Sequence, residues 1–511
     1  MSGDQHRARS VGHIDGVPVF WDDRSGDATT TVELLFRVGL HDERLPSTGL
    51  TELVLRLALD RFPDDQPQLL SGSVDGLVTR CSVGGQPDEV AATVRQLCAE
   101  LSAPSSGSLT RVREELLDAH AVRPHDAELQ LLALRYGPSG PGLHAWGAIG
   151  VHGADDAAVD AWAAARFVRA NMVVRGAGPR PSGLDLPLRQ GRWSPPPPSP
   201  TERIPARTME VEAGEVAVSG VVPLGPALAD ALDVLRRAVG QRLEAEHGWR
   251  VHLLPHIRPL TADRAHLTVT LTIDPERSVP ALRTLLQVLD EQATRTPEAD
   301  PAGRSLPSAA LNPWQTAVQD LLHGPGSLAA TLQPATTPED VRECLAALQE
   351  SVVVLAPHAE PEDLPGMTPY VQSPPPSITD GQRFRVLGSG GRTRSLLVGA
   401  DGVASEEGRR ITTAMRFREL VAVLAWTDGR RQLVDVDGAS LVIPPEEIEH
   451  GFAAVQRIDR AIAPQLVVPI DHPARRPLGD PPLVRRTPDL PAGRATARTS
   501  AERRTQRRRR E

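Results

Sequence analysis

The side chains that could carry chemistry are scattered along this sequence rather than grouped. Cys81, Cys98 and Cys344 lie far apart, with no C-x-x-C pair, so they predict neither a disulfide framework nor a thiolate zinc site. No local signature of a Ser-His-Asp or Cys-His catalytic arrangement occurs. The remaining candidates are His, Glu and Arg residues, which have to be weighed against the helices and strands that carry them.

Two groups of histidines have spacings that invite a metal. His125 and Glu128 form part of an H-x-x-E pattern, but Leu129 stands where the second His would be, so we interpret them as a solvated helix start. His247, His252 and His256 would share a face only in one continuous helix. The pattern of residues 249–257 predicts a strand, which separates them.

Three further groups favour ordinary structural roles. Residues 388–391 lack the Lys-Ser/Thr of a phosphate loop and predict a turn. Glu446, Glu447, Glu449 and His450 follow two prolines at an expected helix start, where acidic side chains complement the helix dipole. A basic loop cluster able to meet a phosphoinositide would need Arg383, Arg385, Arg392 and Arg394.

The elements that would position such residues begin with residues 32–62, which predict a strand, an acidic turn, a Gly and an apolar helix over residues 48–62. Ser47 or Thr48 is the expected cap of that helix. Residues 12–40 predict two strands and residues 69–84 one more. Helices are expected at 87–103, 108–121, 129–136 and 155–169, before a strand at 171–176.

The second part of the chain repeats this order. Strands are expected at 208–222, 249–257 and 265–274, helices at 224–247, 278–293, 312–322 and 338–349, and a closing strand at 351–356. The long period indicates a duplicated domain. From residue 382 the pattern changes to seven short strands and a helix over 444–460, typical of a small barrel closed by a helix.

Composition bounds the class of protein. A chain of 511 residues predicts about three domains. The net charge of −9, despite an Arg-rich C-terminus, argues against a nucleic-acid-binding body. No apolar run of signal-peptide or membrane-span length occurs, so we expect a cytoplasmic protein.

Four stretches, in order, resemble the insulinase (pitrilysin-type) peptidase family, including the mitochondrial processing peptidase subunits. They cover residues 15–180, and residues 208–357 fit a second copy more weakly. The four stretches are VELLFRVGLHDERLPSTGLTELVLRLAL, QPDEVAATVRQLCAELSAPSSGSLTRVREELLDAH, LRYGPSGPGLHAWGAIG and DAAVDAWAAARFVRANMVVRGAG.

The resemblance implies a zinc site built on H-x-x-E-H, with a later third ligand. Our alignment puts Thr51 at the first His, Val54 at the Glu and Leu55 at the second His, so no catalytic residue and no metal ligand is expected there. Near the implied third ligand lie Glu114, Glu115 and His120. A shift of frame supplies no His, because Glu52 has none within a turn on either side.

The second copy is also degenerate at its implied site. The family holds substrate backbone with an Arg and a Tyr around R-E-x-x-G-L-x-Y. Here Glu244 and Val251 stand at those positions. Arg242 and Arg250 are the remaining candidates for substrate binding.

These observations predict an α+β fold with two tandem insulinase-like α/β sandwich domains, followed by a small β-barrel with a C-terminal helix that resembles a pleckstrin-homology domain. The expected boundaries are 12–180 and 208–357 for the two domains, 181–207 and 358–381 for Pro-rich linkers, 382–470 for the barrel, and 471–511 for a disordered Arg/Pro-rich tail.

Three functions are compatible with this sequence. The first is a catalytically inactive insulinase-like subunit that binds a peptide or acts as a scaffold, without cofactor, beside an active family member or a second copy of itself. The second is an active zinc endopeptidase whose ligands lie elsewhere. The third is a non-enzymatic adaptor that recruits protein partners through the barrel.

Overall fold

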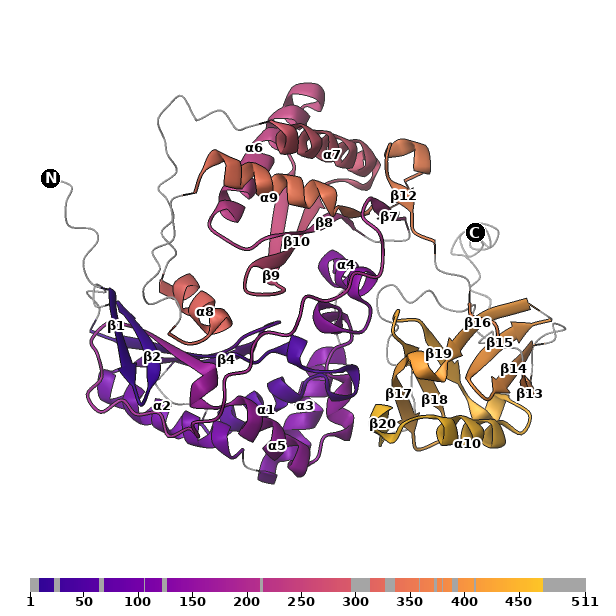
Figure 1. Ribbon diagram of the computed structural model, residues 1–511, viewed down its shortest axis with the longest axis horizontal. Helices are drawn as coiled ribbons and strands as arrows, with labels where there is room; N and C mark the ends of the chain where they lie inside the picture. The colour runs from indigo at the N-terminus through magenta and orange to yellow at the C-terminus, as the bar shows by residue number, and fades with distance from the viewer. Residues whose placement is uncertain are drawn as a thin grey trace, which may run out of the picture.

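The computed structural model describes residues 9–22, 28–63, 69–104, 106–121, 126–211, 215–295, 313–326, 336–357, 359–371, 375–378, 380–387, 394–408 and 410–471. Four sheets organise these residues. We call the two six-stranded sheets with their helices the first and second units, and the part with two four-stranded sheets the C-terminal unit (Figure 1). No helix in the described ranges is both long and apolar enough to cross a membrane.

The first unit has one sheet in the order β1-β2-β6-β3-β5-β4. Its apolar face packs against four helices, with Leu34, Phe36, Leu53, Val94 and Ala163 among the fully buried residues. The strands are β1 (Arg9–Ile14), β2 (Val17–Asp22), β3 (Thr30–Phe36), β4 (Leu69–Val74), β5 (Thr79–Gly85) and β6 (Met172–Ala177), and the helices are α1 (Leu50–Leu59), α2 (Pro87–Ser102), α3 (Leu109–Ala121) and α5 (Asp156–Arg166).

Two expectations for this unit were wrong in strand number. Residues 12–40 contribute to three strands, because Asp15 (φ 50°) and Gly16 (φ 82°) make a tight turn between β1 and β2. Both residues have the positive φ that such hairpins require. Residues 69–84 form a hairpin, β4 and β5, rather than one strand.

The second unit repeats this architecture. Its sheet has the order β12-β7-β11-β8-β10-β9. The strands are β7 (Thr208–Glu210), β8 (Val216–Pro223), β9 (His252–Pro259), β10 (Arg264–Thr272), β11 (Val353–Leu355) and β12 (Thr368–Pro369), and the helices are α6 (Ala227–His247), α7 (Ser278–Thr294) and α9 (Pro338–Glu350).

The pairing in the two sheets is equivalent. β2 pairs parallel with β6 as β7 does with β11, and β6-β3-β5-β4 are successively antiparallel as β11-β8-β10-β9 are. In the chain, α1 follows β3 and precedes the edge strand β4, and α6 likewise follows β8 and precedes the edge strand β9. The helix α1 therefore corresponds to α6, and β4 to β9.

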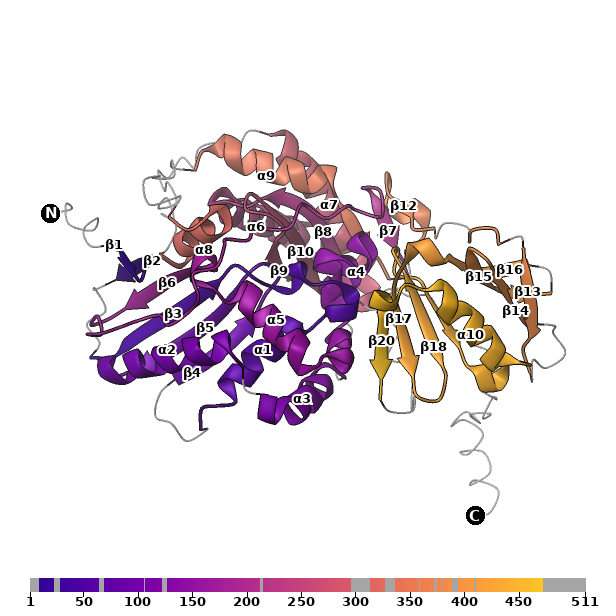
Figure 2. The ribbon, with the colours of Figure 1, turned by 60° about the horizontal axis from the view of Figure 1, so that its bottom comes forward.

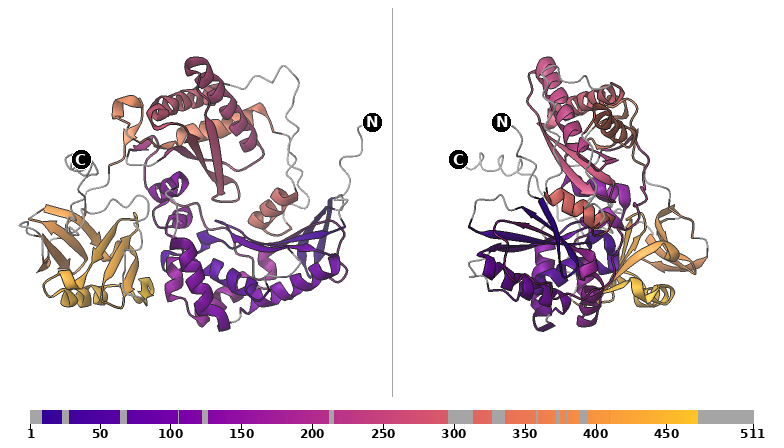
Figure 3. Two further views of the ribbon diagram at one scale, coloured as in Figure 1. Left: turned by 180° about the vertical axis from the view of Figure 1, so that it is seen from behind. Right: turned by 60° about the vertical axis from the view of Figure 1, so that its left-hand side comes forward.

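Each unit also covers a sheet face of the other. The helix α4 (Ala127–Tyr136) buries Leu131 and Leu134 against Ala217 and Leu355 of the second sheet. The helix α8 (Pro313–His323) buries Val318, Leu321 and Leu322 against Leu35 and Val173 of the first sheet. Figures 1 and 3 show α4 below the second sheet and α8 above the first.

Residues 181–207, expected as a Pro-rich linker, are extended but packed. Leu184, Leu186 and Leu188 are buried in the first core. Trp193 donates its indole N–H to the carbonyl oxygen of Leu321, and Arg203 donates its main-chain N–H to Arg135. This segment therefore binds the two units together instead of spacing them.

The C-terminal unit contains the seven predicted strands and one more. The sheets are β13-β14-β15-β16 and β19-β18-β17-β20 around a shared core with α10 (Gly451–Ala461). The strands are β13 (Gly381–Arg385), β14 (Arg394–Gly399), β15 (Gly402–Glu407), β16 (Arg410–Arg416), β17 (Leu420–Trp426), β18 (Arg431–Asp435), β19 (Ser440–Ile443) and β20 (Val467–Ile470).

The helix expected over 444–460 begins later, at Gly451. Pro445–Glu447 forms a 3-10 turn, and Ile448 makes a β-bridge to Val386. The predicted tail falls almost wholly in residues 472–511, outside the described residues.

An apolar interface joins the C-terminal unit to the first unit. Leu143, Trp146 and Ile149 of the first unit pack against Leu424 and Val468. Figure 2 shows β17 and β20 beside the first unit, with α10 farther out. The C-terminal unit is therefore docked rather than tethered.

Candidate functional site

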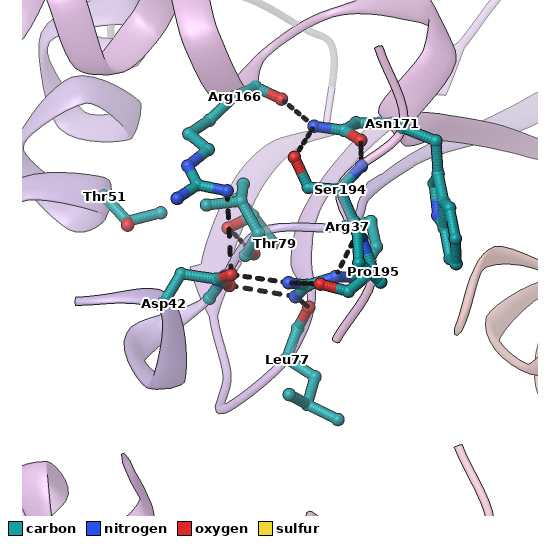
Figure 4. A network of polar contacts seen from close by, with 12 residues as sticks. Arg37, Asp42, Thr51, Leu77, Thr79, Arg166, Asn171, Ser194 and Pro195 are labelled. Carbon is teal, nitrogen blue, oxygen red and sulfur yellow. Dashed lines mark hydrogen bonds and ion pairs between the residues drawn. The ribbon is translucent and has the colours of Figure 1, made fainter. Parts of the chain in front are cut away.

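The turn before α1 is held by Arg37, at the end of β3. This side chain is fully buried, and its two NH groups donate to both carboxylate oxygens of Asp42. Its Nη1 also donates to the carbonyl oxygen of Leu77 at 2.8 Å, and its Nε to that of Ser194 at 3.0 Å (Figure 4). One guanidinium thus fixes the turn, the β4–β5 hairpin and the packed segment 181–207 to one another.

The start of α1 is capped by Glu43 and not by the predicted Ser47 or Thr48. The carboxylate of Glu43 accepts from the main-chain N–H groups of Gly49 and Thr51, each at 2.7 Å. Gly49 has φ 88°, which favours glycine. Burial raises the pKa of Glu43 to about 7, although these hydrogen bonds oppose the shift.

The three positions aligned with the zinc motif lie in the core. Thr51 and Val54 are fully buried and Leu55 is 2 % exposed. The hydroxyl of Thr51 accepts a hydrogen bond from the indole N–H of Trp162 at 3.1 Å. Val54 and Leu55 belong to the apolar cluster of the first unit. These three side chains therefore face packing partners and not a shared polar site.

The polar face of α1 is formed by Glu52 and Arg56, each one residue after the aligned positions Thr51 and Leu55. Arg56 donates to Glu52 Oε1 through Nη2 at 2.7 Å and Nε at 3.0 Å. His120 of α3 lies with its Nε2 2.9 Å from Glu52 Oε2. Of the residues expected near a third ligand, His120 is the one that meets α1; Glu115 pairs with Arg111 on α3 itself, and Glu114 is exposed.

We call Glu52, Arg56 and His120 the α1–α3 triad. All three side chains are partly exposed, at 26 %, 39 % and 17 % respectively. Burial tends to raise the pKa of Glu52, but the hydrogen bonds and charges of His120 and Arg56 outweigh it, so this pKa is lowered. Glu52 is therefore an ion-paired carboxylate, poorly suited to accept a proton near neutral pH.

The described parts of the chain contain no group of three or more His, Cys, Asp or Glu side chains arranged to hold a metal ion. The triad offers one imidazole and one carboxylate, and its third member is a guanidinium, which repels a dication. Leu55, at i+3 from Glu52, has no group to polarise a water molecule.

The substrate-binding candidates of the second unit are not grouped. Arg242 forms a two-pronged ion pair with Glu291, at 2.7 and 2.8 Å. Arg250 is exposed immediately before β9. Glu244 is exposed, and Val251 packs partly against the core. An Arg already bound to a carboxylate is less available to a substrate backbone.

The histidine groups have structural surroundings. His252 and His256 lie in β9, as the strand prediction requires, and His247 stacks on Trp249 with ring centroids 4.3 Å apart. Glu128 is not solvated as expected: it is buried and pairs with Arg258 of β9 at 2.5 and 3.0 Å. His125 lies outside the described residues.

The C-terminal candidates are neutralised only in part. Arg383 pairs with Glu406 at 2.9 Å. Glu446 and Glu447 lie in the 3-10 turn, and His450 adopts φ 57° just before α10. Arg392 and residues 388–391 lie outside the described residues. The predicted basic cluster is thus partly compensated by the acidic strand beside it.

Two sites went unforeseen in the sequence. The cap by Glu43 acts six residues ahead of Gly49, too far for a local capping rule. The pair Glu128–Arg258 joins two units, and Arg258 also reaches Asp75 at 3.2 Å. Of these contacts, the sequence indicates only the pair of Glu52 and Arg56, because their i, i+4 spacing is typical of an ion pair on a helix surface.

The corresponding edge strands β4 and β9 differ in how they are protected. β4 has the sequence LLSGSV, free of Pro and of charge, and its Leu69 is 69 % exposed. β9 carries Pro255, Arg258 and Pro259. Prolines and charges discourage strand pairing at a sheet edge, so β4 is the more open of the two.

Comparison with known proteins finds likeness in structure alone. No family model matches the sequence, and no curated protein matches it. The crystal structure of the peptidase M16 inactive domain from Pseudomonas fluorescens has a TM-score of 0.53 at 14 % identity, covering 68 % of this chain and 97 % of that one. A chain of Complex III2 from Candida albicans, Inz-5 bound, has a TM-score of 0.50 at 13 % identity, covering 68 % and 95 %.

Pitrilysin is also similar, with a TM-score of 0.46 at 12 % identity over 67 % of this chain and 44 % of that one. Identities this low establish architecture and nothing about activity. The likeness to the M16 inactive domain therefore identifies the mixed α/β arrangement that positions α1 as an insulinase-like fold.

Proposed function

We propose that this chain is a non-catalytic insulinase-like protein that serves as a binding or scaffold subunit beside an active metallopeptidase subunit or a second copy of itself. The α1–α3 triad carries the proposal. On this frame the H-x-x-E-H positions are Glu52, Leu55 and Arg56, one residue later than in our alignment from sequence. The ligand positions hold an ion pair, and the position of the base holds a core leucine.

The side chains of α1 that contact α3 support this alignment of the motif. A metal bound between two helices needs donors that face one another. Glu52 contacts His120, whereas Thr51, Val54 and Leu55 are buried. In this arrangement the charge of Arg56 replaces the charge of a cation, so the cluster is satisfied without metal.

The structural likenesses are compatible with such a role. One similar structure is described as an inactive domain, and the other belongs to an assembly. Neither says what this chain binds. The open edge of β4 supports binding of an extended peptide by strand addition, in which main-chain hydrogen bonds supply affinity.

Metal content tests the proposal. Purified protein is dialysed against a buffer that contains zinc, and its metal content is measured by mass spectrometry. We expect the wild-type protein to bind no zinc. The variant E52H/R56H would set two imidazoles opposite His120 and leave the core intact, and we expect it to retain about one zinc per chain. The matched variant T51H/L55H, on the earlier frame, is expected to retain none.

Zinc in the wild-type protein at about one per chain, with hydrolysis of a peptide library, would overturn the proposal in favour of an active endopeptidase. Failure of E52H/R56H to bind zinc while folded would remove the triad as the replaced metal site. Circular dichroism of each variant establishes folding before metal is measured.

The C-terminal unit has a supporting role in this proposal. We infer a pleckstrin-homology-like barrel from its two sheets and closing helix, used for contact with protein. The interface at Trp146 and Ile149 fixes it to the first unit. A docked unit suits a scaffold better than an adaptor that recruits partners through a free module.

A further inference from the structure

A groove lies between the helix α6 and the beginning of β9 in the second unit. Its volume is about 290 Å³, and it is lined by Arg236, Arg237, Gly240 and Gln241 of α6 together with His252 and Leu254 of β9. It lies apart from the α1–α3 triad, in the other unit.

The equivalent groove of the first unit is closed. α6 corresponds to α1 and β9 to β4, so the same helix and edge strand face each other in both units. In the first unit, a Cβ on Gly72 of β4 would lie 2.9 Å from Cδ1 of both Leu55 and Leu59. Those two leucines therefore fill the space between helix and strand.

The second unit leaves this space empty. Gly240 stands on the groove side of α6, and a Cβ built there would meet nothing within 4 Å. Glycine in the interior of a helix costs about 1 kcal/mol relative to alanine. No neighbouring atom packs closely against Gly240, so the absence of a side chain there leaves the groove open.

The lining of the groove is positive. Arg236 pairs with Asp233 at 3.2 Å, but both side chains are at least half exposed, so the pair is weak. Arg237 donates its Nε to the main-chain oxygen of Asp233. No carboxylate of the described residues lies within ion-pair distance of Arg237, so its charge is available to a ligand.

The floor of the groove offers main-chain partners as well. β9 pairs with β10 alone, so its other edge is unpaired among the described residues. Pro255 limits the stretch open to pairing to residues 252–254 at this end. Leu254 is 49 % exposed there and offers apolar contact.

We propose that the α6–β9 groove binds an acidic extended peptide, with its main chain along residues 252–254 and a carboxylate between Arg236 and Arg237. The occupant follows from charge: guanidinium groups bind carboxylates through paired hydrogen bonds. The inference rests on the proposed function in one respect, that this chain holds peptides rather than cleaving them. It places a second, charge-selective contact away from β4.

Fluorescence anisotropy on the full-length protein tests this. The probe is a short labelled peptide of alternating Glu and Thr, and the reference is the same peptide with Gln for every Glu. We expect the acidic peptide to bind roughly tenfold more tightly at low salt, and the difference to shrink as salt is added.

Three variants locate the contact. R236E/R237E is expected to lose roughly tenfold or more of the affinity for the acidic peptide, and Gly240→Leu a similar amount by filling the groove. The matched control R457E/R460E reverses two exposed arginines of α10 and is expected to leave binding unchanged. Equal binding of both peptides, or wild-type affinity in R236E/R237E and Gly240→Leu, would overturn the inference.

A variant in the first unit separates this inference from the proposed function. Leu69→Lys/Ser71→Lys puts charge on β4, the edge proposed for peptide addition. If the Gln peptide binds and is weakened by this variant alone, the α6–β9 groove fails as a site and the proposed function stands. Zinc-dependent cleavage of either peptide would instead remove the proposed function.

Discussion

Individual residues decide what the α1 region can do. The triad pairs Glu52 with Arg56 and His120, so its carboxylate stays ionised and engaged. Glu43, nine residues earlier in the chain, has the opposite environment: it is buried at the helix start, and its pKa is raised to about 7. The two carboxyl groups of this turn and helix therefore respond to pH in opposite ways.

Glu43 is expected to make stability fall as pH rises. The pKa rises from 4.5 in the unfolded chain to about 7 in the folded one, so between these values the folded state binds more protons. Its contribution is fully present below about pH 4.5 and is lost by about pH 7, amounting to about 3 kcal/mol. Urea unfolding across this range should show that slope.

Glu43→Gln provides the comparison, because a neutral amide keeps one acceptor for the main-chain N–H groups and cannot ionise. We expect this variant to lose the slope between about pH 4.5 and 7. An unchanged slope would assign the pH dependence to other groups. Glu115→Gln, an exposed carboxylate on α3, serves as control and should keep it.

At the scale of elements, α1 is a core helix with a narrow polar edge. Residues 50, 53, 54, 55, 57 and 58 are all buried, so its apolar residues surround most of the helix. A pattern this broad predicts burial but does not say which edge meets α3. The frame proposed above differs by one residue from the alignment made from sequence, because the packing partner of α1 enters only in the structure.

Side-chain truncation of one buried leucine in α1 and one exposed leucine in β4 tests the packing of α1. Leu55→Ala is expected to lower the free energy of unfolding by about 2–5 kcal/mol, because Leu55 is 2 % exposed and fills the contact with Gly72. Leu69→Ala, a leucine that is 69 % exposed, should change it by less than about 0.5 kcal/mol. A small effect of Leu55→Ala in guanidinium unfolding would mean that α1 is not packed as described.

The sequence predicted most helices and strands within a few residues, because apolar periodicity and turn residues are local signals. It missed the β1–β2 hairpin, although Asp15-Gly16 is a recognised turn pair. The triad, the cap by Glu43 and the ion pair Glu128–Arg258 join residues distant in the chain. Such contacts depend on how the elements are arranged in space, which the spacing of apolar residues along the chain does not predict.

At the scale of the whole molecule, three units are joined by packed contacts. The segment 181–207 binds the first two, and the cluster of Leu143, Trp146, Ile149, Leu424 and Val468 binds the third. The segment 181–207, predicted as a linker, is thus packed against its neighbours. A protein built this way should unfold with strong coupling between its units.

Removal of the C-terminal unit tests that coupling. A chain ending at residue 378 would expose Leu143, Trp146 and Ile149 to water, and we expect it to associate or precipitate, as seen by light scattering. A chain ending at residue 471 keeps the interface and should remain as dispersed as the full-length protein. A shorter chain that stayed monomeric would show the third unit to be independent.

The exchanged helices α4 and α8 have a consequence for synthesis. The first sheet ends with β6 at residue 177, but the helix that covers its second face ends at residue 323. Those 146 residues (323 − 177) take roughly seven to thirty seconds to translate. Until α8 is made, Leu35 and Val173 lack this apolar cover, so we expect a chaperone to bind the first unit while the rest of the chain is being synthesised.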